Sequence, residues 1–286
     1  MNPFSITTLL ALEERFGMTL SVNVYIVQRS DQAILIDAGF ANDENIQLIM
    51  NEVIRKKLNL QAIYLTHHHI DHSLGAPILA TLQQCPIYCH EKAYDQLVAT
   101  WRKEGFDPSQ LSINKLTKED IIRFQDQTIH VIETPGHAHG HVSYYLEEAD
   151  CLFSGDMVIA GSSVWVGPPD GHLEEYLNSL KKLIELDPSL IYGGHGPVIE
   201  HPRKYMEDLY DRRILRDQQI LTLLQDKAMT VEEIATNLYQ QKGEHWVVRR
   251  NILGHLQRLE KQKRIYSKQD PHLHKLFYMI ANNQSL

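Results

Sequence analysis

Four histidines and one aspartate lie within residues 66–72, which read THHHIDH and directly follow an apolar segment. Imidazole nitrogens and carboxylate oxygens are ligands for Zn²⁺ and the neighbouring first-row metals. His67 and His69 point to one side of an extended backbone because side chains alternate along it with a period of two. Asp71 and His72 follow where the chain turns, so they can reach a second ion. The run therefore predicts a pair of metal ions rather than a polar loop that happens to be rich in histidine.

Three further segments repeat this arrangement, in which a short apolar run ends in glycine and at least one metal-capable side chain. They are residues 134–141 (TPGHAHGH), 153–156 (FSGD) and 191–197 (IYGGHGP). Glycine allows the backbone to turn tightly and to approach a ligand closely. Strand ends that deliver such side chains to one edge predict a single site on the rim of a sheet.

The ordered motifs THxHxDH, PGH, GD and GGHG resemble those of the metallo-β-lactamase-fold superfamily, over residues 20–200 of the chain. The resemblance implies an α/β (α+β) fold, the αββα sandwich, with two sets of metal ligands joined by one carboxylate. The first set is His67, His69 and His137, the second is Asp71, His72 and His195, and the bridge is Asp156. The resemblance also implies that Asp37, in the segment ILIDAG, holds a ligand histidine in its orientation.

Residues 176–183 (YLNSLKKL), 191–199 and 213–224 are similar to the β-lactamase-like protein 2 subgroup of this superfamily. This subgroup joins the hydrolase domain to a C-terminal winged-helix-like domain, and its animal members are metal-dependent endoribonucleases. Two positions depart from the pattern, since His68 stands where tryptophan is common and Ala138 replaces a threonine. Ala138 removes a hydroxyl close to a ligand but removes no ligand, so metal binding is still expected.

The charge balance changes sign along the chain. Residues 1–202 contain 13 Lys and Arg against 26 Asp and Glu, whereas residues 203–286 contain 15 against 10. Because this change follows the last metal motif, we expect a hydrolase domain over residues 1–202 and a winged-helix-like helical domain over residues 203–286. A chain of 286 residues with 43% hydrophobic content is long enough for one large and one small core.

Cysteine usage and the N-terminal segment indicate the compartment. Cys85, Cys89 and Cys151 give an odd number without a CxxC pair, which favours a reducing environment. The apolar stretch of residues 6–12 is short and runs directly into EER, so we expect neither a signal peptide nor a membrane span. These features predict a cytoplasmic protein that does not act at a membrane.

Strand and helix patterns alternate through the first part of the chain, which favours two sheets covered by outer helices. The predicted strands are residues 22–27, 33–37, 62–65, 87–89, 129–133, 143–147 and 151–153. The predicted helices are residues 46–58, 76–83, 92–102 and 173–186. The last of these helices ends before Pro188, as proline requires. Residues 103–119 read as a loop.

The pattern becomes helical beyond Pro202. Helices are predicted over residues 206–225, from Thr230 onward and over residues 247–263, followed by strands at residues 265–267 and 275–279. Thr230 is the expected N-cap, and Glu233 completes a capping box. Three helices and a hairpin are similar to a winged helix-turn-helix. The basic residues of this part are Arg249, Arg250, Arg258, Lys261, Lys263, Arg264 and Lys268. They suggest contact with nucleic acid, and packing on the hydrolase domain or on a second subunit in a homodimer is an equal alternative.

The expected chemistry is hydrolysis at a dinuclear site. Two divalent ions, Zn²⁺ first and Mn²⁺ or Fe²⁺ as alternatives, lower the pKa of a shared water towards ~7 and supply hydroxide. Asp71 would orient this water and take its proton, and the resulting hydroxide would attack a carbonyl or phosphoryl centre. The predicted substrate is therefore an ester-type bond in a small molecule or a phosphodiester in single-stranded RNA. The candidates to line the substrate cleft are His139, His141, Trp165 and His172.

Three other functions stay open at this point. A glyoxalase II-like thioesterase or a lactonase fits the same ligands, although Ile159 stands where lactonases of this fold carry tyrosine. An iron-dependent sulfur dioxygenase uses the same scaffold for redox chemistry, and metal analysis would separate it from a colourless zinc hydrolase. A nucleic-acid-binding module with a secondary hydrolase site would bind RNA in a salt-dependent manner without cleaving it.

Overall fold

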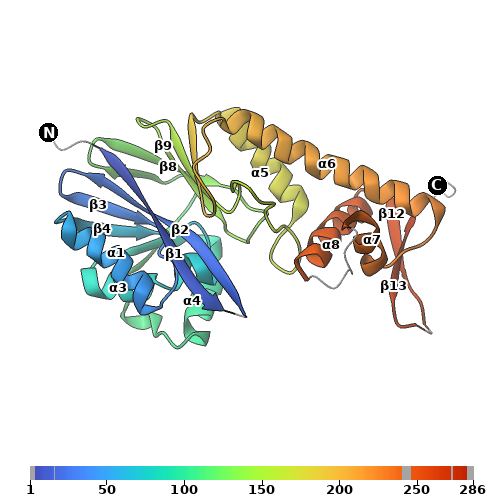
Figure 1. The fold of residues 1–286 in the computed structure, drawn as a ribbon, viewed down its shortest axis with the longest axis horizontal. Coiled ribbons are helices and arrows are strands. Elements are labelled where there is room, and N and C mark those ends of the chain that lie inside the picture. Colours follow the sequence, from blue (N-terminus) through green and yellow to red (C-terminus); the bar gives the residue numbers. More distant parts are fainter. Residues whose placement is uncertain (1–3, 16, 240–245, 272, 282–286) are drawn as a thin grey trace.

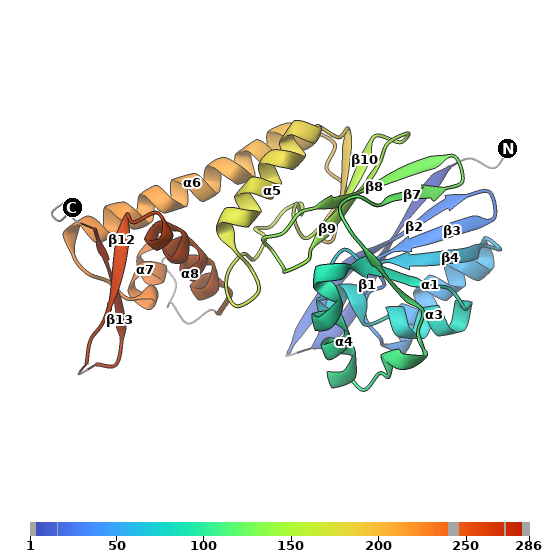
Figure 2. The ribbon, with the colours of Figure 1, turned by 180° about the vertical axis from the view of Figure 1, so that it is seen from behind.

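The computed structural model describes residues 4–15, 17–239, 246–271 and 273–281. Two β-sheets face each other in the larger part of the molecule, and helices cover their outer faces (Figures 1 and 2). A long helix leads from this sandwich to a smaller helical part that ends in a two-stranded hairpin. The predicted α/β fold class, with two sheets between outer helices, is confirmed.

The first sheet contains six strands in the described part of the chain, in sequential order. They are β1 (Ser5–Arg15), β2 (Met18–Arg29), β3 (Gln32–Ile36), β4 (Asn59–Tyr64), β5 (Ile87–His90) and β6 (Ile113–Leu116). β1 to β3 form an antiparallel meander, whereas β3 to β6 run parallel to one another. Because the carboxyl ends of parallel strands meet at one edge, the segments that follow β3 and β4 lie together.

The second sheet has the spatial order β11-β10-β9-β8-β7 among the described residues. Its strands are β7 (Ile121–Phe124), β8 (Gln127–Glu133), β9 (Val142–Leu146), β10 (Cys151–Gly155) and β11 (Leu190–Gly193). β9 is antiparallel to both β8 and β10, and β11 is parallel to β10. β8, β10 and β11 therefore run in one direction, which brings the three motifs that follow them to the same edge.

The outer helices bury apolar faces against the two sheets. The first sheet is covered by α1 (Asp43–Arg55), α3 (Ala76–Gln83) and α4 (Tyr94–Lys103), and the second by α5 (Leu173–Leu186) and the first half of α6 (Pro202–Asp226). The short helix α2 (Ile70–Ser73) and the 3₁₀ turns η1 (Glu91–Ala93) and η2 (Pro108–Gln110) lie in the connections. α1 illustrates the pattern, because Ile46, Ile49 and Val53 recur at helical spacing and are buried.

Alternation along the strands separates two cores. Val24 and Ile26 of β2 pack on the side of the helices, whereas Tyr25 and Val27 pack between the sheets. A strand segment that is buried on both faces is mostly apolar, so residues 24–27 of β2 read as a continuous apolar run, and the buried Asn23 beside them donates to the carbonyls of Gly193 and Gly196. The two sheets are thereby held in fixed positions, and the ligand-bearing edge of each sheet is held with them.

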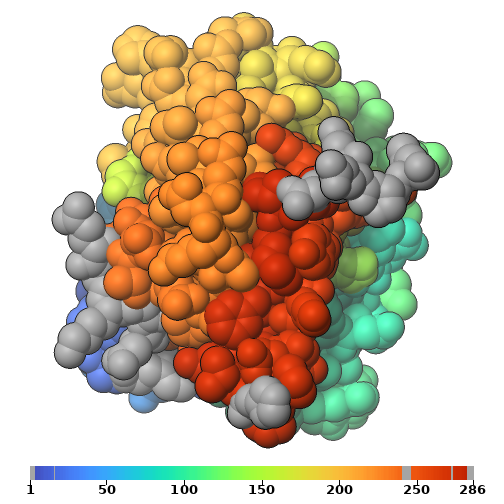
Figure 3. Space-filling model, turned by 90° about the vertical axis from the view of Figure 1, so that its right-hand side faces the viewer, coloured from blue at the N-terminus to red at the C-terminus, as the bar shows by residue number. Residues whose placement is uncertain are grey.

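The C-terminal part has a separate apolar core. The residues of this core come from the second half of α6, α7 (Val231–Tyr239), α8 (Trp246–Lys261), β12 (Ile265–Gln269) and β13 (Leu276–Ile280). α6 begins where the charge balance changes, but Met206 and Leu209 belong to the core of the second sheet, whereas Ile220 and Leu224 belong to the C-terminal core. In Figure 3, α6 in orange lies against the red C-terminal segment.

The predicted capping box at the start of α7 is present. The backbone N–H of Thr230 donates to Glu233 Oε2 at 2.8 Å, and the backbone N–H of Glu233 donates to Thr230 Oγ1 at 3.3 Å. Within the described ranges, no helix combines the length and the apolar character that a membrane span needs.

Three strands were not predicted. β1 lies at the edge of its sheet with Leu10 and Leu12 about half exposed, and no alternation of polar and apolar residues marks it as a strand. The segment predicted as a loop, residues 103–119, contains η2 and β6. β6 and β7 are four residues long, which is too short for periodicity, and their pairing with neighbouring strands decides their conformation.

Candidate metal centre

The residues that follow β3 and β4 form one hydrogen-bonded unit. Asp37 follows β3 with a positive φ of 59°, a conformation that aspartate tolerates better than most residues. One oxygen of its carboxylate accepts the backbone N–H of Thr66 at 2.8 Å, and the other accepts His72 Nδ1–H at 2.7 Å. This hydrogen bond leaves the Nε2 lone pair of His72 available for a cation. The structure therefore places Asp37 where the resemblance implied.

The first three ligand candidates, which we call the histidine group, converge on one point. His69 Nδ1 lies 3.0 Å from His67 Nε2 and 3.0 Å from His137 Nε2. The opposite ring nitrogens of His67 and His137 are also engaged. His67 Nδ1 faces Thr66 Oγ1 at 3.0 Å, and His137 Nδ1 donates to the carbonyl of Trp165 at 2.8 Å. Three lone pairs that face each other in a buried space form a site for a cation.

The other three candidates, Asp71, His72 and His195, form what we call the carboxylate group. Asp71 Oδ2 lies 3.6 Å from His195 Nε2 and 3.8 Å from His72 Nε2. Asp156 faces both groups: its Oδ1 lies 3.3 Å from His195 Nε2, and its Oδ2 lies 3.5 Å from His137 Nε2. The structure thus brings all seven predicted ligands together, with Asp156 between the two groups.

Two atoms at this centre are buried without a hydrogen-bond partner among the described residues, namely His72 Nε2 and Asp156 Oδ1. Leaving such atoms unsatisfied costs free energy of about 1–3 kcal/mol each. Ligand atoms of each group lie within 4.8 Å of one another. The donor set of imidazole nitrogens and carboxylate oxygens suits Zn²⁺, Mn²⁺ and Fe²⁺. The residues present therefore fit the metal ions that the sequence motifs imply.

Four histidines of the centre have shifted pKa values, and the directions differ between the two groups. Burial lowers the pKa of His67 well below its usual value and that of His137 to about 4, and the neighbouring imidazoles lower the pKa of His67 further. Burial also opposes charge on His72, but the carboxylates around it, Asp156 foremost, raise its pKa well above the usual value. The pKa of His195 is raised by Asp156 in the same way, against burial. His67 and His137 are therefore neutral near pH 7, whereas the carboxylates favour a proton on His72 and on His195 in the metal-free centre.

The loop that carries His195 is held by the first sheet and leaves no room for a side chain at Gly194. The backbone N–H of Asn23, on β2, donates to the carbonyl of Gly194 at 2.7 Å. A Cβ atom added at Gly194 would lie 2.4 Å from Asp156 Oδ1 and 2.6 Å from His72 Cε1. Glycine is therefore needed here because the backbone passes directly beside the bridging carboxylate.

The four residues predicted to line a substrate cleft differ in their placement. Trp165 stacks on His69 with ring centroids 5.9 Å apart, and His139 is exposed. The placement of His141 in a cleft is wrong, because its side chain is 1% exposed and both ring nitrogens are engaged by Thr134 Oγ1 and the N–H of Asp156. His141 therefore holds the bridging Asp156 in place rather than contacting substrate. His172 caps α5, where it accepts the N–H of Glu175 at 3.4 Å.

Sequence reasoning missed Asp170. Its Oδ2 accepts His69 Nε2–H at 2.9 Å and lies 3.3 Å from His68 Nε2, while its Oδ1 accepts the N–H of His139 at 2.9 Å. Asp170 lies in an irregular segment about one hundred residues after His69, so no spacing links the two in the sequence. Only the fold brings them together.

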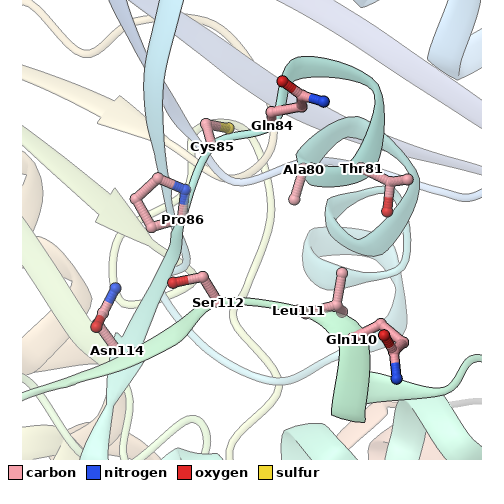
Figure 4. A pocket seen from close by; sticks show the side chains of 9 residues that line it. All are labelled: Ala80, Thr81, Gln84, Cys85, Pro86, Gln110, Leu111, Ser112 and Asn114. Carbon is pink, nitrogen blue, oxygen red and sulfur yellow. The ribbon is translucent and has the colours of Figure 1, made fainter.

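A surface pocket of about 530 Å³ lies elsewhere, at the end of α3 and the start of β5 and β6 (Figure 4). The metal ligands follow the carboxyl end of β4, which is parallel to β5, so this pocket lies at the opposite end of the first sheet. Its lining residues include Gln84, Cys85 and Ser112 but none of the seven ligands. The pocket is therefore separate from the metal centre.

Residues 17–195 match the model of the metallo-beta-lactamase superfamily. This segment is more than half of the chain and contains all seven ligand candidates. The chain therefore belongs to the metallo-beta-lactamase superfamily, and the predicted resemblance is confirmed. It is accordingly a metal-binding hydrolase.

Individual relatives differ in how much of the chain they match. The chain is 30% identical over 204 residues to an atrochrysone carboxyl ACP thioesterase of Aspergillus fumigatus. The matched region covers 71% of this chain but only 60% of that protein. It is 27% identical over 257 residues to a beta-lactamase-like protein 2 homolog of Drosophila melanogaster, covering 87% of the chain and 86% of that protein. A solved metallo-beta-lactamase family protein from Thermus thermophilus shares the fold, with a TM-score of 0.77 at 23% identity over 96% of this chain and 98% of that one.

Proposed function

We propose that this chain holds two divalent metal ions and hydrolyses an ester-type bond, and that its substrate is an acyl thioester. The observation that supports this most directly is that His72 Nε2 and Asp156 Oδ1 are buried, face each other at 3.4 Å and make no hydrogen bond in the described part of the chain, at the point where the two ligand groups meet. The histidine group would hold one ion, the carboxylate group the other, and Asp156 both. When bound, the ions, with Zn²⁺ as the expected metal, supply Lewis acidity and lower the pKa of a water.

The side chains of the centre divide the remaining tasks. Asp71 has a carboxylate that is 23% exposed and lies 3.6 Å from His195 Nε2. A carboxylate at the open side of a buried centre can orient a water molecule and accept its proton. Asp156 stays ionised, because His195 and His72 lower its pKa well below the usual value although burial acts to raise it. Asp37 keeps the ring of His72 in one orientation.

The protonation that the leaving group requires favours a thioester as the substrate. The ring nitrogens of His67, His69 and His137 face each other or a hydrogen-bond partner, so these imidazoles are not placed to protonate a departing atom. An alkoxide would depend on the proton that Asp71 takes from the water, whereas a thiolate, whose conjugate acid has a pKa near 8.5, leaves without it. The thioesterase relative from Aspergillus fumigatus supports the same choice.

A second candidate is the cleavage of a phosphodiester in single-stranded RNA. The similarity to the beta-lactamase-like protein 2 homologue extends over 87% of the chain and therefore reaches into the basic C-terminal part. However, Arg258 contacts Glu174 and Asp217, and Arg249 contacts Glu232, so two of the seven basic side chains are neutralised within the chain. We therefore place this candidate second.

The test compares three probes on the metal-loaded full chain: an acyl thioester of N-acetylcysteamine, the matching oxygen ester and a single-stranded RNA. We expect thiol release that stops on addition of EDTA and returns when Zn²⁺ is restored, with slower turnover of the oxygen ester. Thioester turnover that survives exhaustive chelation would contradict the proposal. Cleavage of the RNA with no action on the thioester would replace it by the second candidate.

Two further measurements address the alternatives. Metal analysis of the purified chain distinguishes a zinc hydrolase from an iron-containing sulfur dioxygenase, which would also consume oxygen. RNA binding by the full chain across a salt series tests the C-terminal part, because phosphate contacts weaken with salt at a log–log slope of about −0.7 per contact for single strands. Charge reversal at Lys261, Lys263 and Arg264 should then reduce that slope. Binding that is absent or insensitive to salt would leave this part with a packing role.

A further inference from the structure

One irregular segment, residues 164–170, contacts two of the three imidazoles of the histidine group. We call this segment the strap. It lies between β10, which precedes the bridging aspartate, and α5. Val164 and Val166 are each 1% exposed and belong to the apolar core under the second sheet. Buried anchors at two alternate positions place the intervening and following residues of the strap beside the metal centre.

Asp170 contacts His69 on the side away from the centre. Its Oδ2 accepts His69 Nε2–H at 2.9 Å, which leaves the Nδ1 lone pair of His69 facing the other two imidazoles. Its Oδ1 accepts the backbone N–H of His139 at 2.9 Å, so the carboxylate is itself held at both oxygens. A carboxylate that receives the second ring N–H of a ligand histidine sets both the tautomer and the ring orientation.

The strap orients His137 through its backbone. The carbonyl of Trp165 accepts His137 Nδ1–H at 2.8 Å, and the Trp165 ring stacks on His69 with an angle of 18° between the planes. The Nε2 lone pair of His137 is thereby directed at His69 Nδ1. A displacement of the strap would therefore move both rings, whereas none of its described contacts reaches Asp71, His72 or His195.

Helix α8, from the C-terminal part, fixes the strap. The backbone N–H of Val166 donates to Asn251 Oδ1 at 2.9 Å in a buried contact. A Cβ atom at Gly167 would lie 2.1 Å from the carbonyl oxygen of Arg250, and one at Gly254 would lie 2.7 Å from that of Val166. The two backbones therefore touch with no side chain between them, and the hydrogen bond from Val166 sets their register.

We propose that Asp170 is a positioning residue for the histidine group and that Asn251 of α8 holds the strap in the place from which Asp170 acts. This inference rests on the proposed dinuclear centre and extends it, because it gives the C-terminal part a role in metal binding. The ion held by the histidine group depends on α8 for its affinity, and the ion held by the carboxylate group does not.

The test must distinguish the positioning role of Asp170 from a role as a metal ligand. His68, His69 and Asp170 themselves offer three ligand atoms within 4.8 Å of one another. If Asp170 were a ligand of an additional ion, its removal would change the number of ions bound. If it is a positioning residue, its removal changes the affinity of one ion and leaves the number at saturation the same.

The experiment titrates the metal-free full chain with Co²⁺ against a competing chelator, which yields a dissociation constant for each ion. His69→Ala and His195→Ala identify which constant belongs to which group. We expect Asp170→Ala to weaken the histidine-group constant by about 10–100-fold and to leave the other within about twofold. Asp170→Asn, which keeps one acceptor oxygen, should fall in between. The matched control is Asp126→Asn, since Asp126 pairs with Arg29 on the surface.

The role of α8 is tested by two substitutions at one position. Asn251→Leu leaves the buried N–H of Val166 without an acceptor and should weaken the same constant as Asp170→Ala does. Asn251→Asp keeps an acceptor oxygen and should restore the histidine-group constant. A loss of general stability in Asn251→Leu would not explain such a restoration. Asn237→Leu on α7, whose side chain is exposed, is the control.

The outcomes separate this inference from the proposed function. An unmodified chain that binds fewer than two ions would contradict the proposed function itself. Two ions in the unmodified chain, with both constants unchanged by Asp170→Ala and Asn251→Leu, would overturn the inference alone. So would three ions in the unmodified chain and two in Asp170→Ala, because Asp170 would then be a ligand.

Discussion

The two halves of the metal centre differ in charge and in what orients them. The histidine group consists of three imidazoles whose outer nitrogens face a hydroxyl, a carbonyl and a carboxylate. In the carboxylate group, Asp37 holds His72 and the backbone of Ser21 on β2 holds His195. Burial lowers the pKa values of His67 and His137, whereas the carboxylates of the second group raise those of His72 and His195. One centre can therefore combine imidazoles that resist protonation with imidazoles that exchange a proton for metal.

The largest effect is expected where the two halves share a ligand. Asp156→Ala removes the carboxylate that faces His195 with one oxygen and His137 with the other. We expect metal content to fall to about one ion or fewer per chain and thioester turnover to fall to background. Metal analysis of the purified variant after dialysis measures this. Retention of two ions and full turnover would show that the halves do not depend on a common bridge.

A smaller effect, strongest on the carboxylate side, is expected from Gly194→Ala. The new methyl group would overlap Asp156 Oδ1 and His72 Cε1, so these ligands must move. A displacement of about 1 Å at a catalytic centre costs on the order of 10²-fold in rate. Gly161→Ala is the control: it has a positive φ of 75° but open space, so it should lose stability of about 1–2 kcal/mol and keep its metal. Equal loss of metal in both variants would contradict the argument.

Lowering the pH should release the ion of the carboxylate group before the ion of the histidine group, without any mutation. A ligand nitrogen must lose its proton to bind a cation, so the raised pKa values of His72 and His195 make metal binding weaken as pH falls. Each proton displaced costs about tenfold in affinity per pH unit below its pKa. The pKa of His137 is lowered to about 4 and that of His67 well below its usual value, so these two ligands should stay unprotonated down to about pH 5 and the histidine group should release its ion at a lower pH than the carboxylate group does. Cobalt titrations at several pH values test this, and parallel loss of both ions would refute it.

The smallest effect is expected from Asp37→Asn. The amide retains the shape of the side chain but loses the charge that holds His72 Nδ1–H. We expect about tenfold weaker binding at the carboxylate group, with the histidine group unchanged. The same Co²⁺ competition assay measures both constants. A loss confined to the histidine group would reverse the assignment of Asp37.

Much of the site was predictable because ligands stand next to strand ends in the sequence. His67, His69, Asp71 and His72 are close neighbours, and local geometry alone directs them to one edge. His137, Asp156 and His195 carry the same signal, a glycine with a ligand-type residue after an apolar run. Short or half-exposed strands such as β1 and β6 lack any such local signal, because pairing with a neighbour rather than periodicity determines them.

The burial of particular rings was not predictable in this way. His139 and His141 are two residues apart and were given the same expected role, but one is exposed and the other is 1% exposed behind the bridge. Which of two neighbouring side chains faces inward depends on how the turn after β8 packs on β10. That packing involves atoms far away in the sequence.

By itself, the sequence determined the ligand types, their order and the edge of the sheet at which they meet, since these depend on local spacing and on the direction of strands. Only the tertiary structure decided which groups orient them. Asp170 meets His69 across about one hundred residues, and Asn251 reaches the strap from a helix near the other end of the chain. A hydrogen bond between such distant segments requires a precise position of both backbones. That position results from the packing of whole elements and leaves no periodic or local trace in the sequence.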